Sequence, residues 1–195
     1  MLEGNINYAG AVITWLQKDL GLIKNAAESG ILAASANEED SCYLVPAFSG
    51  LGAPYWNSSA RASFSGMSRT TGRAELVKAA VESIAYQVTD IVEAMTEDSG
   101  IVLSELRVDG GPTANDYLMQ FQADMANTLI RIPRAGELSA IGAAYMAGIS
   151  AGILPRSILT EDRTERIFRP QMHSTIRRQK LDGWHQSVRQ AISNI

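Results

Sequence analysis

The chain has 195 residues, 46% of them hydrophobic, which is enough for one large domain with a buried core, with or without an appendage. Its net charge of −4 argues against a nucleic-acid-binding surface, which would need a clustered basic face. There is no signal peptide, and no apolar run approaches the roughly 20 residues of a membrane span, so we expect a cytoplasmic protein without nucleic-acid or membrane partners.

The cysteine content limits the chemistry further. The single cysteine, Cys42, excludes an internal disulfide and a cysteine-based metal cage. The apolar residues that follow it predict that Cys42 is a small buried residue and not a nucleophile.

The first third of the chain predicts two short strands and at least one helix. Apolar residues recur at helical spacing from Ala9 to Leu20, and Gly21 follows as a stop. Residues 24–41 are polar and rich in Ala and Ser, which is compatible with a second short helix or with a surface loop. Strands are expected at 43–48 and 63–68, separated by an irregular loop that contains several Gly and Pro residues.

The strongest helical pattern runs from Arg73 to Met95. Thr70 or Thr71 is expected to cap its start, and residues 98–100 end it. Four charged residues lie off its apolar stripe and predict a polar face: Glu75, Lys78, Glu82 and Glu93.

Strands and helices alternate in the second half of the chain. We expect strands at 103–108 and 129–133, and helices at 114–126, 139–152 and 174–193. This order predicts an α/β fold with a mixed, partly parallel sheet flanked by helices. The helix at 139–152 is unusually rich in Gly and Ala, which suits either close packing against a sheet or close approach to a ligand.

The stretch "LRVDGGPTAND" joins a predicted strand to a predicted helix. Gly110 and Gly111 leave backbone N–H groups uncovered at the start of that helix, where the helix dipole favours an anion or a polar ligand edge. Pro112 suits a first helical turn, and Asn115 offers a donor and an acceptor toward the same space. The pattern is neither a P-loop nor a dinucleotide fingerprint, so a plain turn and a nucleotide pocket both remain open.

Longer stretches resemble the FGGY carbohydrate kinases. "VPAFSGLGAPYW" at 45–56 resembles a loop of the glycerol kinases in that family, with Ser49 where threonine is usual. "ASFSGMSRTTGRAELVKAAVE" at 62–82 fits the family's second signature. The segments "LEGNINYAGAVITWL", "RVDGGPTANDYLMQFQAD" and "SAIGAAYMAG" also resemble glycerol kinase segments in the same order. The resemblance covers nearly the whole chain and is weakest at 24–41 and after residue 155.

The resemblance implies an actin-like, ribonuclease-H-like ATPase domain. In that family two such domains close on ATP and a polyol or sugar, and residues 1–195 would be one domain, the C-terminal one, which supplies much of the adenosine pocket. Thr14 stands where glutamine is typical of glycerol kinases, and Pro112 where alanine is usual. The nucleotide-binding residues that the resemblance implies are Gly10, Thr14, Gly110, Gly111, Pro112 and Asn115.

The family's reaction transfers the terminal phosphoryl group of ATP to a substrate hydroxyl, with Mg²⁺ and an aspartate base. The resemblance places that aspartate upstream of this chain, so we expect the chain alone to be inactive and its partner to be its own N-terminal domain. Asp109 is expected to cap or brace its turn, and His173 and His185 to lie at the surface. A domain without its partner would expose apolar surface and self-associate, and a homo-oligomer is expected.

Other functions remain possible at this stage. Glycerol is the substrate that the resemblance favours, and xylulose, ribulose or gluconate kinases of the same family are the alternatives. An actin- or chaperone-type ATPase and a non-catalytic interaction domain, whose glycines serve only packing, are the alternatives outside the family.

Overall fold

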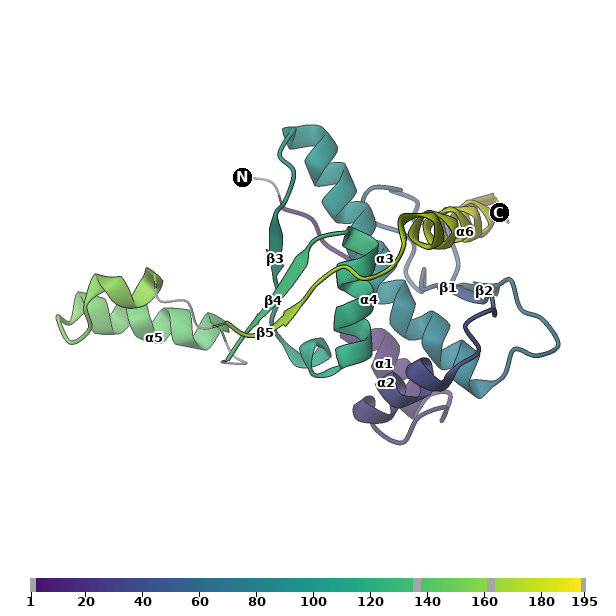
Figure 1. Ribbon diagram of the computed structural model, residues 1–195, viewed down its shortest axis with the longest axis horizontal. Helices are drawn as coiled ribbons and strands as arrows, with labels where there is room; N and C mark the ends of the chain where they lie inside the picture. Colours follow the sequence, from purple (N-terminus) through teal and green to yellow (C-terminus); the bar gives the residue numbers. More distant parts are fainter. Residues whose placement is uncertain (1–2, 135–137, 161–163, 194–195) are drawn as a thin grey trace.

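The computed structural model describes residues 3–134, 138–160 and 164–193 (Figure 1). Its helices are α1 (Gly10–Lys18), α2 (Ala26–Ser35), α3 (Arg73–Ser99), α4 (Asp116–Ala126), α5 (Leu138–Ser150) and α6 (Ser174–Ser193), with two 3₁₀ turns, η1 (Gly111–Ala114) and η2 (Arg156–Thr160). Its strands are β1 (Tyr43–Val45), β2 (Ser63–Ser65), β3 (Glu105–Arg107), β4 (Leu129–Pro133) and β5 (Thr164–Phe168). None of the helices in these ranges combines the length and apolar character that a membrane span requires.

The strands form two small sheets. β1 pairs antiparallel with β2, while β4 lies between β3, to which it is parallel, and β5, to which it is antiparallel. The expected mixed, partly parallel sheet is therefore confirmed. Strand β5 was not among the predicted strands, and α2 shows that residues 24–41 contain a helix, which was one of the two alternatives.

The long helix α3 is the centre of the molecule and packs against α1, α2, α4 and β1. Its first turn is closed by the Glu75 carboxylate, which accepts the Gly72 N–H at 2.9 Å, and Gly100 ends the helix in the left-handed conformation. The expected threonine cap is wrong, because the Thr71 hydroxyl donates instead to Asp40.

Two charged residues of α3 contradict the expected polar face. Lys78 and Glu82 are 7% and 4% exposed. The Lys78 ammonium donates to the Asn37 carbonyl at 3.1 Å, and Glu82 accepts the Tyr117 hydroxyl at 2.6 Å. Because other elements pack around this part of α3, these two side chains are buried although they lie off the apolar stripe, and they need polar partners, whereas Glu93 is exposed.

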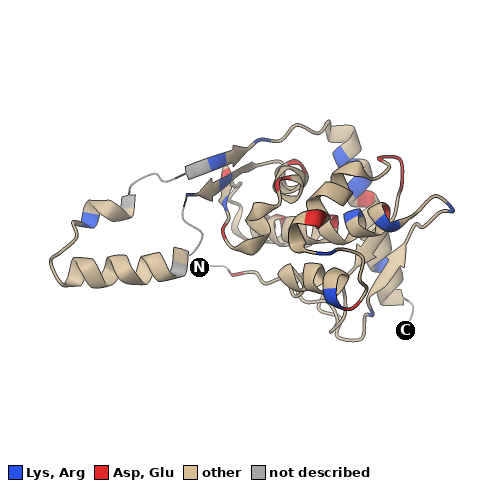
Figure 2. Ribbon diagram, turned by 90° about the horizontal axis from the view of Figure 1, so that it is seen from below, with Lys and Arg blue, Asp and Glu red and all other residues tan. Residues whose placement is uncertain are grey.

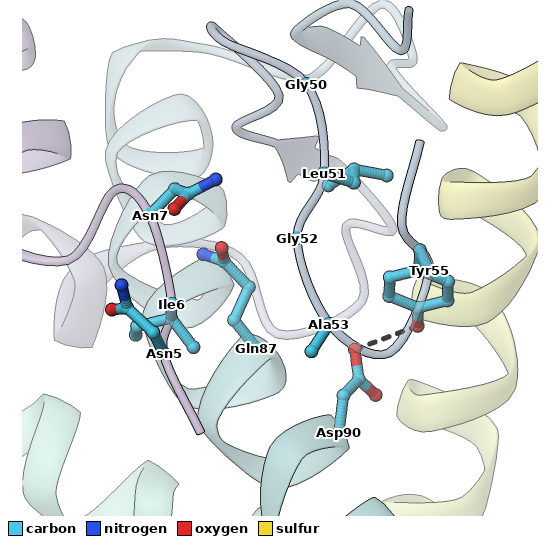
Figure 3. Close-up of a pocket in the computed structure, with 10 residues that line it drawn as sticks. All are labelled: Asn5, Ile6, Asn7, Gly50, Leu51, Gly52, Ala53, Tyr55, Gln87 and Asp90. Carbon is cyan, nitrogen blue, oxygen red and sulfur yellow. Dashed lines mark hydrogen bonds between the residues drawn. The ribbon is translucent and has the colours of Figure 1, made fainter. Parts of the chain in front are cut away.

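A carboxylate on α3 joins three parts of the chain. Asp90 is 5% exposed and accepts hydrogen bonds from the Tyr55 hydroxyl at 2.8 Å and the Trp184 indole N–H at 2.8 Å, and its other oxygen bonds His185 Nε2 at 3.0 Å. Figure 3 shows the bond from Tyr55. His185 is half-buried here, with 34% of its side chain exposed, so it lies only partly at the surface, whereas His173 is exposed as expected.

Cys42 is buried, as expected, and burial raises the pKa of its thiol to about 12. A thiol with so high a pKa is protonated at neutral pH, so Cys42 is a poor nucleophile.

The α5 and η2 segments form an arm that stands away from the rest of the molecule (Figure 1). Within the described residues, α5 packs mainly against η2. Figure 2 shows that α5 carries no charge, and its Met146 is 60% exposed, while Ile153 beyond the helix is 77% exposed. The expected packing of this helix against the sheet is not present in the described residues.

Candidate functional site

The first predicted site residue, Gly10, begins α1. The residue before it, Ala9, provides no side-chain cap, so the first N–H groups of the helix have no side-chain acceptor. Thr14 lies one turn further along, is exposed, and donates its hydroxyl to the Gly10 carbonyl at 3.4 Å. Both residues therefore lie at an open helix end with their polar groups accessible.

The turn from Gly110 to Asn115 carries the remaining predicted residues. Gly110 has φ +93° and ψ 177°, a conformation that is essentially restricted to glycine. Gly111 and Pro112 are the first two residues of η1. The Thr113 hydroxyl closes the turn by donating to the Gly110 carbonyl at 2.7 Å.

An arginine on β5 holds this turn against the sheet. Arg166 donates from Nη2 to the Thr113 carbonyl at 2.6 Å, and from Nη1 to the Asp116 carboxylate. Asp109, which was expected to brace the turn, is exposed and makes no side-chain hydrogen bond within the described ranges. The brace comes instead from Thr113 and Arg166. Because Arg166 is 53 positions from Thr113, no local sequence pattern indicates this contact.

Asn115 caps α4 and contacts α2. Its Oδ1 accepts the Leu118 N–H at 3.1 Å, and its Nδ2 donates to the Ser29 hydroxyl oxygen at 3.3 Å. Gly30 lies directly beneath the amide, since a Cβ atom built on it would lie 2.6 Å from Oδ1 of Asn115. Ser29 and Gly30 were not predicted as site residues, because they fall in the segment where the family resemblance is weakest.

The described glycines fall into groups according to why a side chain is absent at each position. Many lack a Cβ because a neighbouring atom fills the space, as at Gly30, or because their φ is positive, as at Gly110. Among the described glycines, neither reason applies to Gly10, Gly111 and Gly142, where no atom lies within 4 Å of the missing Cβ and φ is ordinary. Packing among the described residues therefore does not account for Gly10 or Gly111.

The structure brings the residues from 110 to 115 together in one turn. α2 packs against α4, which follows this turn, and also against α1, which carries Gly10 and Thr14. In Figure 1 the η1 turn, α1 and α2 lie at the same end of the molecule. The predicted residues thus form two groups, at the start of α1 and at the η1 turn, with α2 as the element that contacts both helices.

None of these residues lines either of two hollows in the described structure. The first is a cavity of about 10 Å³, the size of one water molecule. The amides of Asn5, Asn7 and Gln87 and the Tyr55–Asp90 pair are among the residues that line it (Figure 3). A groove of about 580 Å³ runs between α6 and the β1–β2 sheet. Within the described residues, no group of three or more His, Cys, Asp or Glu side chains could hold a metal ion.

Comparisons with known proteins point to one family. A model of the C-terminal domain of the FGGY family of carbohydrate kinases matches residues 1–151. Glycerol kinases from Paraburkholderia phytofirmans and Burkholderia cenocepacia are 47% and 49% identical over 192 residues, which are 97% of this chain and 38% of each relative. The chain therefore spans less than half the length of these curated relatives.

Solved structures agree with the sequence relatives. Glycerol kinase from Plasmodium falciparum, crystallised with ADP, is 36% identical and superposes with a TM-score of 0.89 over 98% of this chain and 38% of its own. Xylulose kinase from Lactobacillus acidophilus is 21% identical, with a TM-score of 0.80 over 97% of this chain and 39% of its own, and shows the same fold.

Proposed function

The chain belongs to the FGGY family of carbohydrate kinases, as a C-terminal domain of that family, and from this membership we propose that it is the adenosine-binding part of an ATP-dependent polyol kinase. Its fold is accordingly that of an actin-like ATPase domain. The site assignment rests mainly on the open space at Gly10 and Gly111, which no atom of the described residues fills.

In this proposal the nucleotide lies between the start of α1 and the η1 turn. Glycines at both places let the ligand approach the main chain, and the uncapped N–H groups of α1 favour its polar groups. Asn115 offers amide groups from the start of α4. Thr14 provides a hydroxyl in place of the usual glutamine amide. Because the threonine side chain is shorter, it reaches less far toward the nucleotide.

Two parts of the chemistry lie outside this chain. The described residues offer no carboxylate cluster for a metal, so Mg²⁺ would arrive with the ATP phosphates and with ligands from the other part of the kinase. The aspartate base that accepts the substrate proton would come from that part as well. We therefore expect the chain alone to bind nucleotide weakly and to transfer no phosphoryl group, and the intact kinase to act in the cytoplasm.

Glycerol is the substrate that we propose for the intact kinase. The curated relatives at 47–49% identity are glycerol kinases, whereas the xylulose kinase at 21% identity shares the fold alone. To test this, the intact kinase is assayed with ATP and, in parallel, with glycerol, xylulose, ribulose and gluconate as substrates. Phosphorylation of glycerol is expected, and activity only on one of the other three would overturn the substrate assignment.

The arm is where we propose that the rest of the kinase packs. α5 is uncharged and exposes apolar side chains, and about three fifths of each relative lies outside the matched part. When the chain is studied alone, the same surface should join two copies. Met146→Lys should make the isolated chain monomeric at unchanged melting temperature and should weaken the intact kinase. A wild-type chain that is monomeric, with a fully active Met146→Lys kinase, would disprove this role.

A further inference from the structure

Asn115 is hydrogen-bonded to helix α2, for which the sequence predicted no role in the site. Ser29 of α2 is 1% exposed, and its hydroxyl donates to the Ala26 carbonyl at 2.6 Å. With its proton committed to Ala26, the Ser29 oxygen can only accept from Asn115, and the bond from Nδ2 is 3.3 Å long. On the other side, the Leu118 N–H can only donate, and it meets Oδ1 at 3.1 Å.

These two contacts specify the same orientation of the amide. If the Asn115 amide were flipped, its oxygen would face the Ser29 oxygen, and its NH₂ group would face the Leu118 N–H. Both contacts would then be repulsive. The flat surface over Gly30 adds a steric limit, since a Cβ atom there would lie 2.6 Å from Oδ1 and 3.1 Å from Cγ of Asn115. The two hydrogen bonds therefore fix the orientation of the Asn115 amide. The absence of a side chain at Gly30 leaves the space in which the amide lies against α2.

We propose that Ser29 and Gly30 are positioning residues that fix the Asn115 amide and thereby set which nucleotide base the site accepts. This rests on the proposed function, in which Asn115 contacts the nucleotide. After the bonds to Ser29 and Leu118, the amide keeps one N–H and one oxygen lone pair. A neighbouring donor and acceptor complement the amino group and ring nitrogen of adenine, whereas the corresponding edge of guanine presents two acceptors at O6 and N7.

The experiment measures steady-state kinetics of the intact kinase with ATP and with GTP. Ser29→Ala removes the acceptor and frees the amide to rotate, and alanine is the better helix former, so the variant should fold. We expect the KM for ATP to rise about fivefold, the loss of one neutral hydrogen bond, with little change in kcat or in the KM for the polyol. The preference for ATP over GTP should fall by a similar factor. Gly30→Ala should have the larger effect, because it displaces the amide outright.

Ser35→Ala is the matched control. Ser35 lies on the same helix, is exposed, and donates its hydroxyl to the Leu32 carbonyl of its own helix at 2.9 Å, so its removal should leave all constants unchanged. A double-mutant cycle sharpens the test further: in an Asn115→Ala background, Ser29→Ala should add nothing to the KM for ATP.

The outcomes separate the two proposals. A wild-type kinase that neither binds ATP nor phosphorylates a polyol with it would overturn the proposed function. The wild-type enzyme could instead be active while Ser29→Ala and Gly30→Ala keep its KM for ATP and its preference for ATP over GTP. This result would support the proposed function and overturn the role of α2. An equal effect of Ser29→Ala in the Asn115→Ala background would also overturn it, because Ser29 would then act independently of Asn115.

Discussion

Two polar centres of this molecule are built in opposite ways. Around Asp90, each carboxylate oxygen is bonded to a side chain from a distant part of the sequence, and Trp184, one of the donors, is fully buried. At the η1 turn, by contrast, Gly110 and Gly111 face open space, and Asn115 keeps hydrogen-bonding capacity that the chain does not use.

This difference separates residues that hold the fold from residues that are available to a ligand. A polar cluster that is closed within the chain has no capacity left for a substrate, and its value lies in joining α3, α6 and the loop that carries Tyr55. An open turn contributes little to packing, and its conformation must be fixed by other elements, here β5 and α2. Substitutions at Asp90 should therefore affect stability, as should those at Gly110, whose backbone conformation only glycine adopts easily, whereas those at Gly111 should affect nucleotide binding.

The largest expected effect on stability is at Asp90. Asp90→Ala removes the acceptor of the Tyr55 hydroxyl and of the buried Trp184 indole N–H, and each unsatisfied buried donor costs about 1–3 kcal/mol. We expect a loss of about 3 kcal/mol or more in the free energy of unfolding, measured by urea denaturation. Glu97→Ala, an exposed position on the same helix, is the control and should change little. An equal loss in both variants would show that the Asp90 contacts are not the cause.

The next effect is expected at Gly110. Its φ of +93° with ψ of 177° is strained for any other residue, so Gly110→Ala should cost about 1–3 kcal/mol although no neighbouring atom obstructs the new methyl group. Gly111→Ala is the matched control, with ordinary φ and equally open space, and should be almost neutral. Thermal unfolding of both variants tests the difference, and equal melting temperatures would contradict it.

A smaller effect is expected from pH at His185. The hydrogen bond to Asp90 raises the pKa of this imidazole above its ordinary value, and the nearby Glu93 also favours the charged form. A raised pKa in the folded state means that the ion pair contributes fully below the unfolded value of about 6.5. That contribution is lost as the pH rises through the folded pKa.

Because the side chain of His185 is 34% exposed, solvent screens this pair, and we expect less than about 1 kcal/mol. Urea denaturation of the wild type across this pH window should show the fall, and His185→Gln should abolish it. His173→Gln is the control, because His173 is exposed, and it should keep the wild-type pH dependence. A wild-type profile in the His185→Gln variant would refute the assignment.

The sequence predicted local features well and long-range contacts poorly. Helical spacing identified α1 and α3, and the Gly-Gly-Pro pattern located the turn, because these signals lie within a few neighbouring residues. The Asp90 cluster joins positions 55, 90, 184 and 185, and no local pattern connects them. The same holds for Lys78 and Glu82, whose burial depends on how many elements surround α3.

The candidate site divides in the same way. Gly10, Gly111 and Asn115 followed from motifs, whereas Ser29, Gly30 and Arg166 act on the turn from α2 and β5 and are visible only in the fold. The role expected for Asp109 failed for this reason: a carboxylate next to a turn is a local cue, but the turn is braced from a strand far along the sequence.

The smallest expected effect on stability is at Gly111. Substitutions there test most directly the contrast between the closed Asp90 cluster and the open η1 turn. No atom of the part of the chain that the structure describes lies within 4 Å of its missing Cβ, so Gly111→Val should change the free energy of unfolding by no more than about 0.5 kcal/mol. In the intact kinase the same isopropyl group would occupy the space where the nucleotide meets the main chain. The KM for ATP should therefore rise about tenfold or more, equivalent to about 1.4 kcal/mol, while the KM for the polyol stays near its wild-type value. The effect should grow with side-chain size from Gly111→Ala to Gly111→Val. Unchanged ATP kinetics in a stable Gly111→Val kinase would mean that the open turn is not a binding site, and the contrast with Asp90 would then reflect packing alone.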